Sequence, residues 1–160
     1  MKKNFIKNII AVLVLVLAVS IVWIVLEQGG NKTADIENQL AAIMYKTPTC
    51  GCCQVYGQYL KREDVDVTVI DVEDIAPIKE QYGIPRNLES CHTTMIGGYV
   101  VEGHIPMVII EKLLAEKPEI KGIALPGMPS GSPGMPGPKT EEWTIYALNN
   151  DGTVTEFMKY

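Results

Sequence analysis

Three of the four cysteines in this chain lie within four positions, in the segment Cys50-Gly51-Cys52-Cys53. The apolar stretch 40–45 before them predicts a buried strand, and residues 54–61 after them have the apolar spacing of a short helix. We therefore expect the three thiols on a strand-to-helix turn. A helix N-terminus stabilises anions, because its first N–H groups are unpaired and its dipole is positive there, and this lowers thiol pKa values. Such thiols suit soft-metal binding or disulfide exchange.

A long apolar segment precedes this turn. Residues 9–26 contain no charged residue and cover most of a membrane hydrocarbon core, which is roughly 30 Å thick. Signal-peptide cores are usually shorter, about 7–15 residues, so an uncleaved transmembrane anchor is favoured over a cleaved signal. Three lysines precede the segment, and no Lys or Arg follows it before Lys32. The positive-inside rule then keeps residues 1–8 in the cytoplasm and places the rest outside it.

The rest of the chain divides into a spacer and a domain. Residues 27–38 are expected to be a polar spacer, and residues 39–160 form an exported domain long enough to bury its own core. Thiols in an exported domain tend to oxidise, and four cysteines allow three full pairings. The net charge is −5 and no basic cluster lies outside the first seven residues. Nucleic acid is therefore not expected as a partner, because phosphate binding needs concentrated Lys and Arg.

The order of predicted elements indicates an α/β fold. Strands are predicted over residues 40–45, 65–72, 91–96 and 99–102, and helices over residues 54–61, 75–82 and 108–114. The last two strands form a hairpin around Gly97-Gly98. The first two strands should be parallel, because a helix joins them. This order is that of a thioredoxin-like domain, a mixed sheet with helices on both faces.

Two segments follow these elements. Residues 127–138 are rich in Gly, Pro and Ser, which predicts turns and polyproline-like pieces instead of regular helix or sheet. Residues 142–148 and 153–157 are expected to form a C-terminal β-hairpin, because Asp151-Gly152 between them is a favoured turn pair.

The fourth cysteine is predicted to join the other three. In the thioredoxin-like order Cys91 falls at the start of the third strand, where thioredoxins carry a proline packed against their redox pair. The only two histidines, His92 and His104, belong to the same hairpin and offer imidazoles as metal ligands. Neighbours on a regular strand point to opposite faces. Cys91 and His92 therefore share a site only if the strand is irregular there.

Two methionines complete the candidate ligands. Met128 and Met135 offer thioethers, which bind Cu(I) in preference to the other common metals. The two side chains are equally suited to fill gaps beneath a loop. The full set of candidate metal ligands is Cys50, Cys52, Cys53, Cys91, His92, His104, Met128 and Met135.

Four motifs carry a resemblance to a known family. They are Thr47-Pro48-Thr49-Cys50-Gly51-Cys52-Cys53, Glu89-Ser90-Cys91-His92-Thr93, Gly98-Tyr99-Val100-Val101-Glu102-Gly103-His104-Ile105-Pro106, and Leu125-Pro126-Gly127-Met128-Pro129 with Gly131-Ser132-Pro133-Gly134-Met135. These motifs resemble those of the CopG-type copper-resistance proteins, a family long labelled as a domain of unknown function. The resemblance implies an exported thioredoxin-like domain that binds copper through clustered cysteines and aids copper tolerance. Typical members are periplasmic with a cleaved signal, and the apolar N-terminal segment and C-terminal hairpin depart from that pattern.

The first functional hypothesis is a membrane-anchored, extracytoplasmic protein that holds Cu(I). Four thiols and two imidazoles exceed the needs of one mononuclear centre, so a thiolate-bridged cluster is expected. Its partners would be copper ions, the membrane through the N-terminal helix, and other copper-export or copper-chaperone proteins. Zinc is the competing metal, since Cys and His suit it too, and the methionine-bearing loop favours copper.

The second hypothesis is a thiol–disulfide oxidoreductase. Cys50 and Cys53 form a Cys-x-x-Cys pair at a helix start, with Cys91 or Cys52 as the resolving thiol. Cys52 inside the motif would compete for the mixed disulfide, and the histidines would have no task. We therefore favour a metal-binding protein over an enzyme. A third alternative is an inert module held by a disulfide.

Overall fold

The computed structural model describes residues 16–17, 19–20, 23 and 40–160. The chain divides into two compact units, Met1–Gln39 and Leu40–Tyr160. Across the described residues there is no helix with the length and apolar character needed to span a membrane. The predicted anchor over residues 9–26 lies mostly outside the described residues, and the spacer over 27–38 lies wholly outside them.

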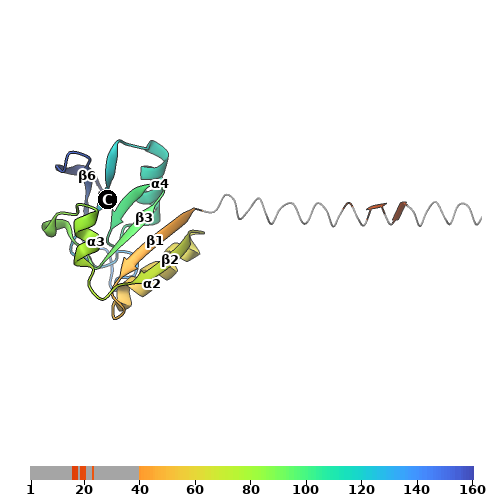
Figure 1. Ribbon diagram of the computed structural model, residues 1–160, viewed down its shortest axis with the longest axis horizontal. Helices are drawn as coiled ribbons and strands as arrows, with labels where there is room; N and C mark the ends of the chain where they lie inside the picture. The colour runs from red at the N-terminus through yellow and green to blue at the C-terminus, as the bar shows by residue number, and fades with distance from the viewer. Residues whose placement is uncertain (1–15, 18, 21–22, 24–39) are drawn as a thin grey trace, which may run out of the picture. The chain divides into compact units, whose positions relative to one another are not determined.

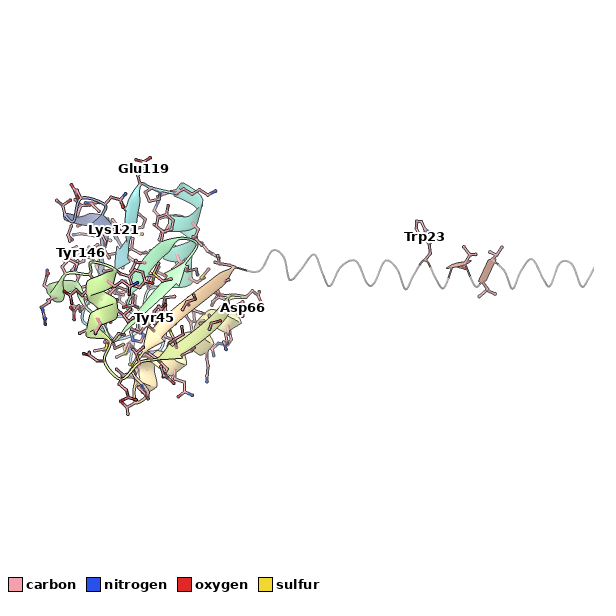
Figure 2. The ribbon with its side chains drawn as sticks, viewed as in Figure 1. Trp23, Tyr45, Asp66, Glu119, Lys121 and Tyr146 are labelled. Carbon is pink, nitrogen blue, oxygen red and sulfur yellow. A yellow bond between two sulfur atoms is a disulfide. The ribbon has the colours of Figure 1, made fainter. Side chains whose placement is uncertain are left out.

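A seven-stranded mixed sheet is the framework of the unit Leu40–Tyr160, with the strand order β2-β1-β3-β4-β5-β6-β7 (Figure 1). Its strands are β1 (Ala41–Lys46), β2 (Asp66–Asp71), β3 (His92–Ile96), β4 (Tyr99–Glu102), β5 (Ile120–Ala124), β6 (Thr144–Asn149) and β7 (Val154–Lys159). The helices of this unit are α2 (Gly51–Arg62), α3 (Ala76–Gln81), α4 (Met107–Glu116) and the short 3-10 helix η1 (Arg86–Leu88). In Figure 2, Asp66 on the edge strand β2 lies well apart from Lys121 on β5, as the strand order requires.

The predicted order of strand, helix, strand, helix, hairpin and helix is confirmed. Strands β1 and β2 are parallel, and β3 and β4 form the expected antiparallel hairpin. The C-terminal hairpin is also present as β6 and β7. Helix α2 begins three residues earlier than predicted, at Gly51, because the side chain of Cys50 caps it.

Strand β5 was missed by the sequence analysis. Its sequence, Ile-Lys-Gly-Ile-Ala, contains a glycine and an alanine, which are depleted in strands. The structure pairs β5 parallel to β4 and antiparallel to β6. This strand therefore makes the C-terminal hairpin a continuation of the main sheet.

Two apolar clusters cover the two faces of the sheet. Neighbouring residues on a strand point to opposite faces, and Val101 of β4 belongs to the larger cluster while Val100 belongs to the smaller. The larger cluster contains Tyr56 and Leu60 of α2 together with Leu113 of α4. The smaller cluster contains Ile84 and Leu88, which follow α3 in the chain, together with Ala124 and Leu148. Helices α2 and α4 thus pack against one face of the sheet, and the N-terminus of α2 carries the cysteines.

Gly122 of β5 provides a test of this sheet. A Cβ atom at this position would lie 1.9 Å from the backbone oxygen of Val100. We expect Gly122→Ala to lower the free energy of unfolding by about 2–3 kcal/mol, because β4 and β5 would have to separate. Urea unfolding followed by circular dichroism measures this loss.

Gly51→Ala is the matched control, since a Cβ atom there meets nothing within 4 Å. We expect it to change the free energy of unfolding by less than about 1 kcal/mol. Equal losses in the two variants would contradict the close approach of β4 and β5.

Candidate metal centre

The cysteine turn joins β1 to α2 and is held by its own sulfur atoms. Cys50 occupies the N-cap of α2, and its Sγ accepts a hydrogen bond of 3.4 Å from the backbone N–H of Cys53. A side-chain acceptor at this position satisfies one of the unpaired N–H groups of the first helical turn. Cys50 and Cys53 are joined by a disulfide across that turn, with 5.3 Å between their Cα atoms. This is the Cys-x-x-Cys pair that the sequence analysis singled out.

The other two cysteines, Cys52 and Cys91, are free thiols next to this disulfide. The Sγ of Cys52 lies 3.6 Å from the Sγ of Cys50 and 3.8 Å from the Sγ of Cys91. All four sulfur atoms lie within 4.8 Å of one another. Cys91 therefore joins the cysteine turn in space although 37 residues separate it from Cys53, as the thioredoxin-like order predicted.

Both histidines converge on Cys91. Its Sγ lies 3.0 Å from Nε2 of His104 and 3.5 Å from Nδ1 of His92. Cys91 lies in a bend just before β3, and His92 is the first residue of that strand. The chain is therefore irregular at Cys91, which is the condition under which the two neighbours can share a site. Cys91, His92 and His104 form a second group whose ligand atoms lie within 4.8 Å of one another.

Gly103 allows the chain to turn and bring His104 back to the site. Its φ is +83°, a backbone conformation that residues other than glycine rarely adopt. A Cβ atom here would lie 2.5 Å from the backbone oxygen of Leu125 and 2.9 Å from Cβ of Ser90. The residue before His104 therefore has to be a glycine.

Burial determines the protonation of the site. Desolvation lowers the pKa of His104, and it lowers the pKa of His92 further with help from the neighbouring charges of His104 and Lys79. Desolvation, followed by the charge of Cys52, raises the pKa of Cys91 to about 12. At neutral pH both imidazoles are therefore neutral, with a lone pair available to a metal, and Cys91 is a thiol whose proton a metal must displace.

The Gly/Pro/Ser loop packs directly on the site. Nδ1 of His104 donates to the carbonyl oxygen of Pro133 at 2.7 Å, which leaves Nε2 as the unprotonated nitrogen facing Cys91. Gly134, with φ +86°, lies so close that a Cβ atom would approach the backbone oxygen of Cys52 to 2.9 Å. The loop thus fixes the tautomer of His104 and touches the cysteine turn.

The two predicted methionine ligands belong to this loop. Met135 is half-buried and directly follows Gly134, whereas Met128 is 37% exposed. The structure thus brings the six cysteine and histidine residues together and places the methionines on the segment that covers them. The thioether contribution to metal binding stays a prediction.

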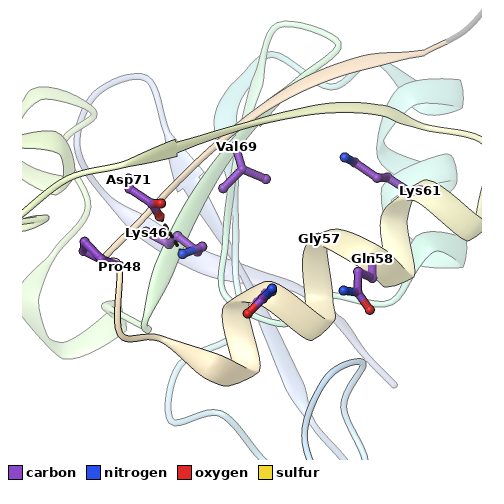
Figure 3. A pocket seen from close by; sticks show the side chains of 8 residues that line it. Lys46, Pro48, Gly57, Gln58, Lys61, Val69 and Asp71 are labelled. Atoms are coloured by element: carbon purple, nitrogen blue, oxygen red, sulfur yellow. Dashed lines mark hydrogen bonds and ion pairs between the residues drawn. The ribbon is translucent and has the colours of Figure 1, made fainter.

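A polar cleft of about 400 Å³ lies on another side of α2 (Figure 3). It is bordered by Gln58 and Lys61 of the helix and by Lys46 and Asp71 of β1 and β2. Lys46 and Asp71 form an ion pair with 2.5 Å between Nζ and Oδ1. No cysteine lines this cleft among the described residues, so the cleft is separate from the sulfur cluster.

Sequence reasoning missed two groups that contact the site. The ring centroid of Tyr56 lies 4.5 Å from that of His92 and 5.3 Å from that of His104, and its hydroxyl donates to the backbone oxygen of Ile105. Lys79 and Glu102 form a buried ion pair, and Glu102 accepts a hydrogen bond from the backbone N–H of Ser90, the residue before Cys91. A tyrosine on an apolar helix face and isolated charges carry no sequence signal of a site. Only their burial in the folded structure identifies these residues as part of the surroundings of the site.

Comparisons with known proteins find one matching family and two similar folds. The family described as "Protein of unknown function, DUF411" matches residues 88–135. No curated protein matches the chain. Two solved structures, both called copper resistance protein copG (Form 2 and Form 1), align with TM-scores of 0.71 and 0.70 at 34% identity.

These alignments cover nearly the whole of the solved chains. They span 77% of the present chain, and 99% and 98% of the two copG chains. The resemblance first noted from four sequence motifs therefore extends to the fold over most of the chain. The chain belongs to the CopG copper-resistance family.

Proposed function

We propose that this protein binds Cu(I) through its converging thiolates and imidazoles and serves in copper tolerance or copper handling. The observation that carries the proposal is the position of Cys91, whose sulfur belongs both to the four-sulfur group and to the group with His92 and His104. Thiolate sulfur bridges soft metal ions, and Cu(I) prefers thiolate, thioether and imidazole ligands. Two donor groups that share one sulfur suit a thiolate-bridged cluster of more than one ion.

The donor set by itself also suits zinc, because four thiolates make a common structural zinc site. Two observations favour copper. The relatives in solved structures are copper-resistance proteins by name. The loop that covers the site carries two thioethers, which bind Cu(I) better than zinc.

The Cys50–Cys53 disulfide links copper binding to the redox state. A disulfide sulfur is not a thiolate, so two electrons from an external thiol reductant must cleave the S–S bond before all four cysteines can bind metal. The disulfide also favours the second candidate function, thiol–disulfide exchange. Cys52, 3.6 Å from Cys50, can attack the Sγ of Cys50 as a thiolate and release Cys53 as a thiolate, with no net oxidation.

We also infer that the folded unit is thioredoxin-like and lies outside the cytoplasm. The order of elements from β1 to α4 supports the first inference. The apolar residues 9–26 and the lysines before them support a membrane anchor with an exported domain.

The anchor predicts that the intact protein stays in the membrane fraction after a high-salt wash. About 18 apolar residues bind a bilayer far more strongly than surface charge does. Fractionation with immunoblotting measures the result, with a version lacking residues 9–26 as the control. A mature protein whose N-terminus follows Ser20 would contradict the uncleaved anchor.

The copper proposal predicts more than one Cu(I) per reduced full-length chain. Cys50→Ser or Cys53→Ser should remove most of this binding, since each deletes a thiolate from the four-sulfur group. Anaerobic titration against a chromophoric Cu(I) chelator gives the stoichiometry. The oxidised wild type serves as the control and should bind fewer ions, because its disulfide withholds two ligands. Zero copper bound with all four thiols reduced would refute the proposal.

Cys91→Ala separates the two candidate functions. If the protein binds copper, the variant should lose at least one Cu(I) or about tenfold in affinity while its circular dichroism spectrum stays native. If the protein is an oxidoreductase, the variant should still reduce insulin through Cys50 and Cys53. Unchanged copper binding in Cys91→Ala would show that Cys91, His92 and His104 do not belong to the metal site.

A further inference from the structure

A buried polar network contacts the backbone just before Cys91. Lys79 of α3 and Glu102 at the end of β4 form an ion pair, with side chains 2% and 0% exposed. The hydroxyl of Thr93 accepts from Nζ of Lys79 at 3.2 Å and donates to Oε2 of Glu102 at 2.6 Å. Removing two charges from water is costly, so a buried pair contributes little net stability compared with apolar side chains of the same shape. The network therefore calls for a role other than stability.

Glu102 connects this network to the metal centre. Its Oε1 accepts a hydrogen bond of 2.5 Å from the backbone N–H of Ser90, the residue before Cys91. Ser90 lies before β3, outside the strand. Its backbone N–H donates to the carboxylate of Glu102, whereas the backbone of residues inside the sheet pairs with a neighbouring strand. The backbone of the residue after Glu102, Gly103, donates to the backbone oxygen of His92 at 3.2 Å. One carboxylate thus lies where the segment leading to Cys91 meets the segment leading to His104.

We propose that Lys79, Thr93 and Glu102 are positioning residues that hold the Ser90–Cys91 backbone so that the sulfur of Cys91 reaches both donor groups of the copper site. This inference rests on the proposed copper function. The Sγ of Cys91 lies 3.8 Å from the Sγ of Cys52 on one side and 3.0 Å from Nε2 of His104 on the other, and a bridging ligand must stay within reach of both neighbours. Lys79 and Thr93 orient the carboxylate, and the carboxylate orients the backbone. Partners that orient metal ligands in this way typically contribute a factor of about 10–100 in metal affinity.

Two neighbouring threonines allow a matched test. Thr93 and Thr94 are adjacent in β3 and both are fully buried. Thr93 belongs to the network, whereas the hydroxyl of Thr94 has no hydrogen-bond partner in the described part of the chain. Threonine and valine have the same shape, so Thr93→Val and Thr94→Val each replace one buried hydroxyl by a methyl group, and only the first removes a bond to Glu102.

The experiment uses reduced full-length protein and two readouts. Cu(I) affinity is measured by competition with a chromophoric chelator, and protection of the Ser90 amide is measured by hydrogen exchange in the metal-free protein. Thr93→Val is expected to weaken Cu(I) binding about tenfold and to speed exchange at Ser90. Thr94→Val should change neither quantity, and Thr93→Ser, which keeps the hydroxyl, should return both towards the wild-type values.

Either of two results overturns the inference. One is native copper affinity and native Ser90 protection in Thr93→Val. The other is an equal loss in Thr94→Val, because copper binding would then follow core stability alone. If Thr93→Val does not fold, Glu102→Gln, which keeps the side-chain shape, is expected to give the same two losses and overturns the inference if it gives neither. A wild-type protein that binds no Cu(I) refutes the proposed function, while Ser90 exchange still decides whether the network holds this backbone.

Discussion

Antiparallel pairing between β1 and β3 is the constraint on which the site depends. In this register Lys46, the last residue of β1, lies opposite His92, the first residue of β3. The chain that leaves β1 for the cysteine turn and the chain that enters β3 through Cys91 therefore run side by side. The pairing thus brings four sulfur atoms from two segments that are distant in sequence together at the N-terminus of α2. Neither segment needs a local sequence signal for its contact with the other. The disulfide, the histidines and the covering loop are all arranged around this meeting point.

Burial and covalent state together decide what the sulfur atoms can do. In the metal-free protein two cysteines are tied in a disulfide, and burial keeps Cys91 protonated by raising its pKa. The neutral imidazole of His104, oriented by the carbonyl of Pro133, faces that thiol with its free nitrogen. In the proposed function, metal binding and disulfide formation would compete for the same sulfur atoms, and the reducing power of the surroundings would decide which of them prevails.

The sequence predicts local elements well, because strands, helices and hairpin turns each have their own periodic or turn signals. The position of Cys91 could also be predicted, because the order of elements implies which strand ends lie together. Cys50 and Cys53 were named as a pair in the oxidoreductase hypothesis, but the sequence could not decide that these two are the cysteines that are joined, since connectivity depends on distances in space. Glu102 and Lys79 were missed for a related reason. The sequence does not show whether a charged residue in an apolar strand, such as Glu102, is solvated or is buried against an opposite charge on a helix, such as Lys79.

The sulfur of Cys91 is common to two donor groups, and this has a consequence for how the proposed site would bind successive copper ions. Two ions that share a ligand are not independent, so the first ion changes the affinity for the second by the same factor as the second changes the affinity for the first. In the proposed cluster the protein would behave as one coupled unit, in which the free energy of copper binding belongs to the set of ions and cannot be divided between separate sites.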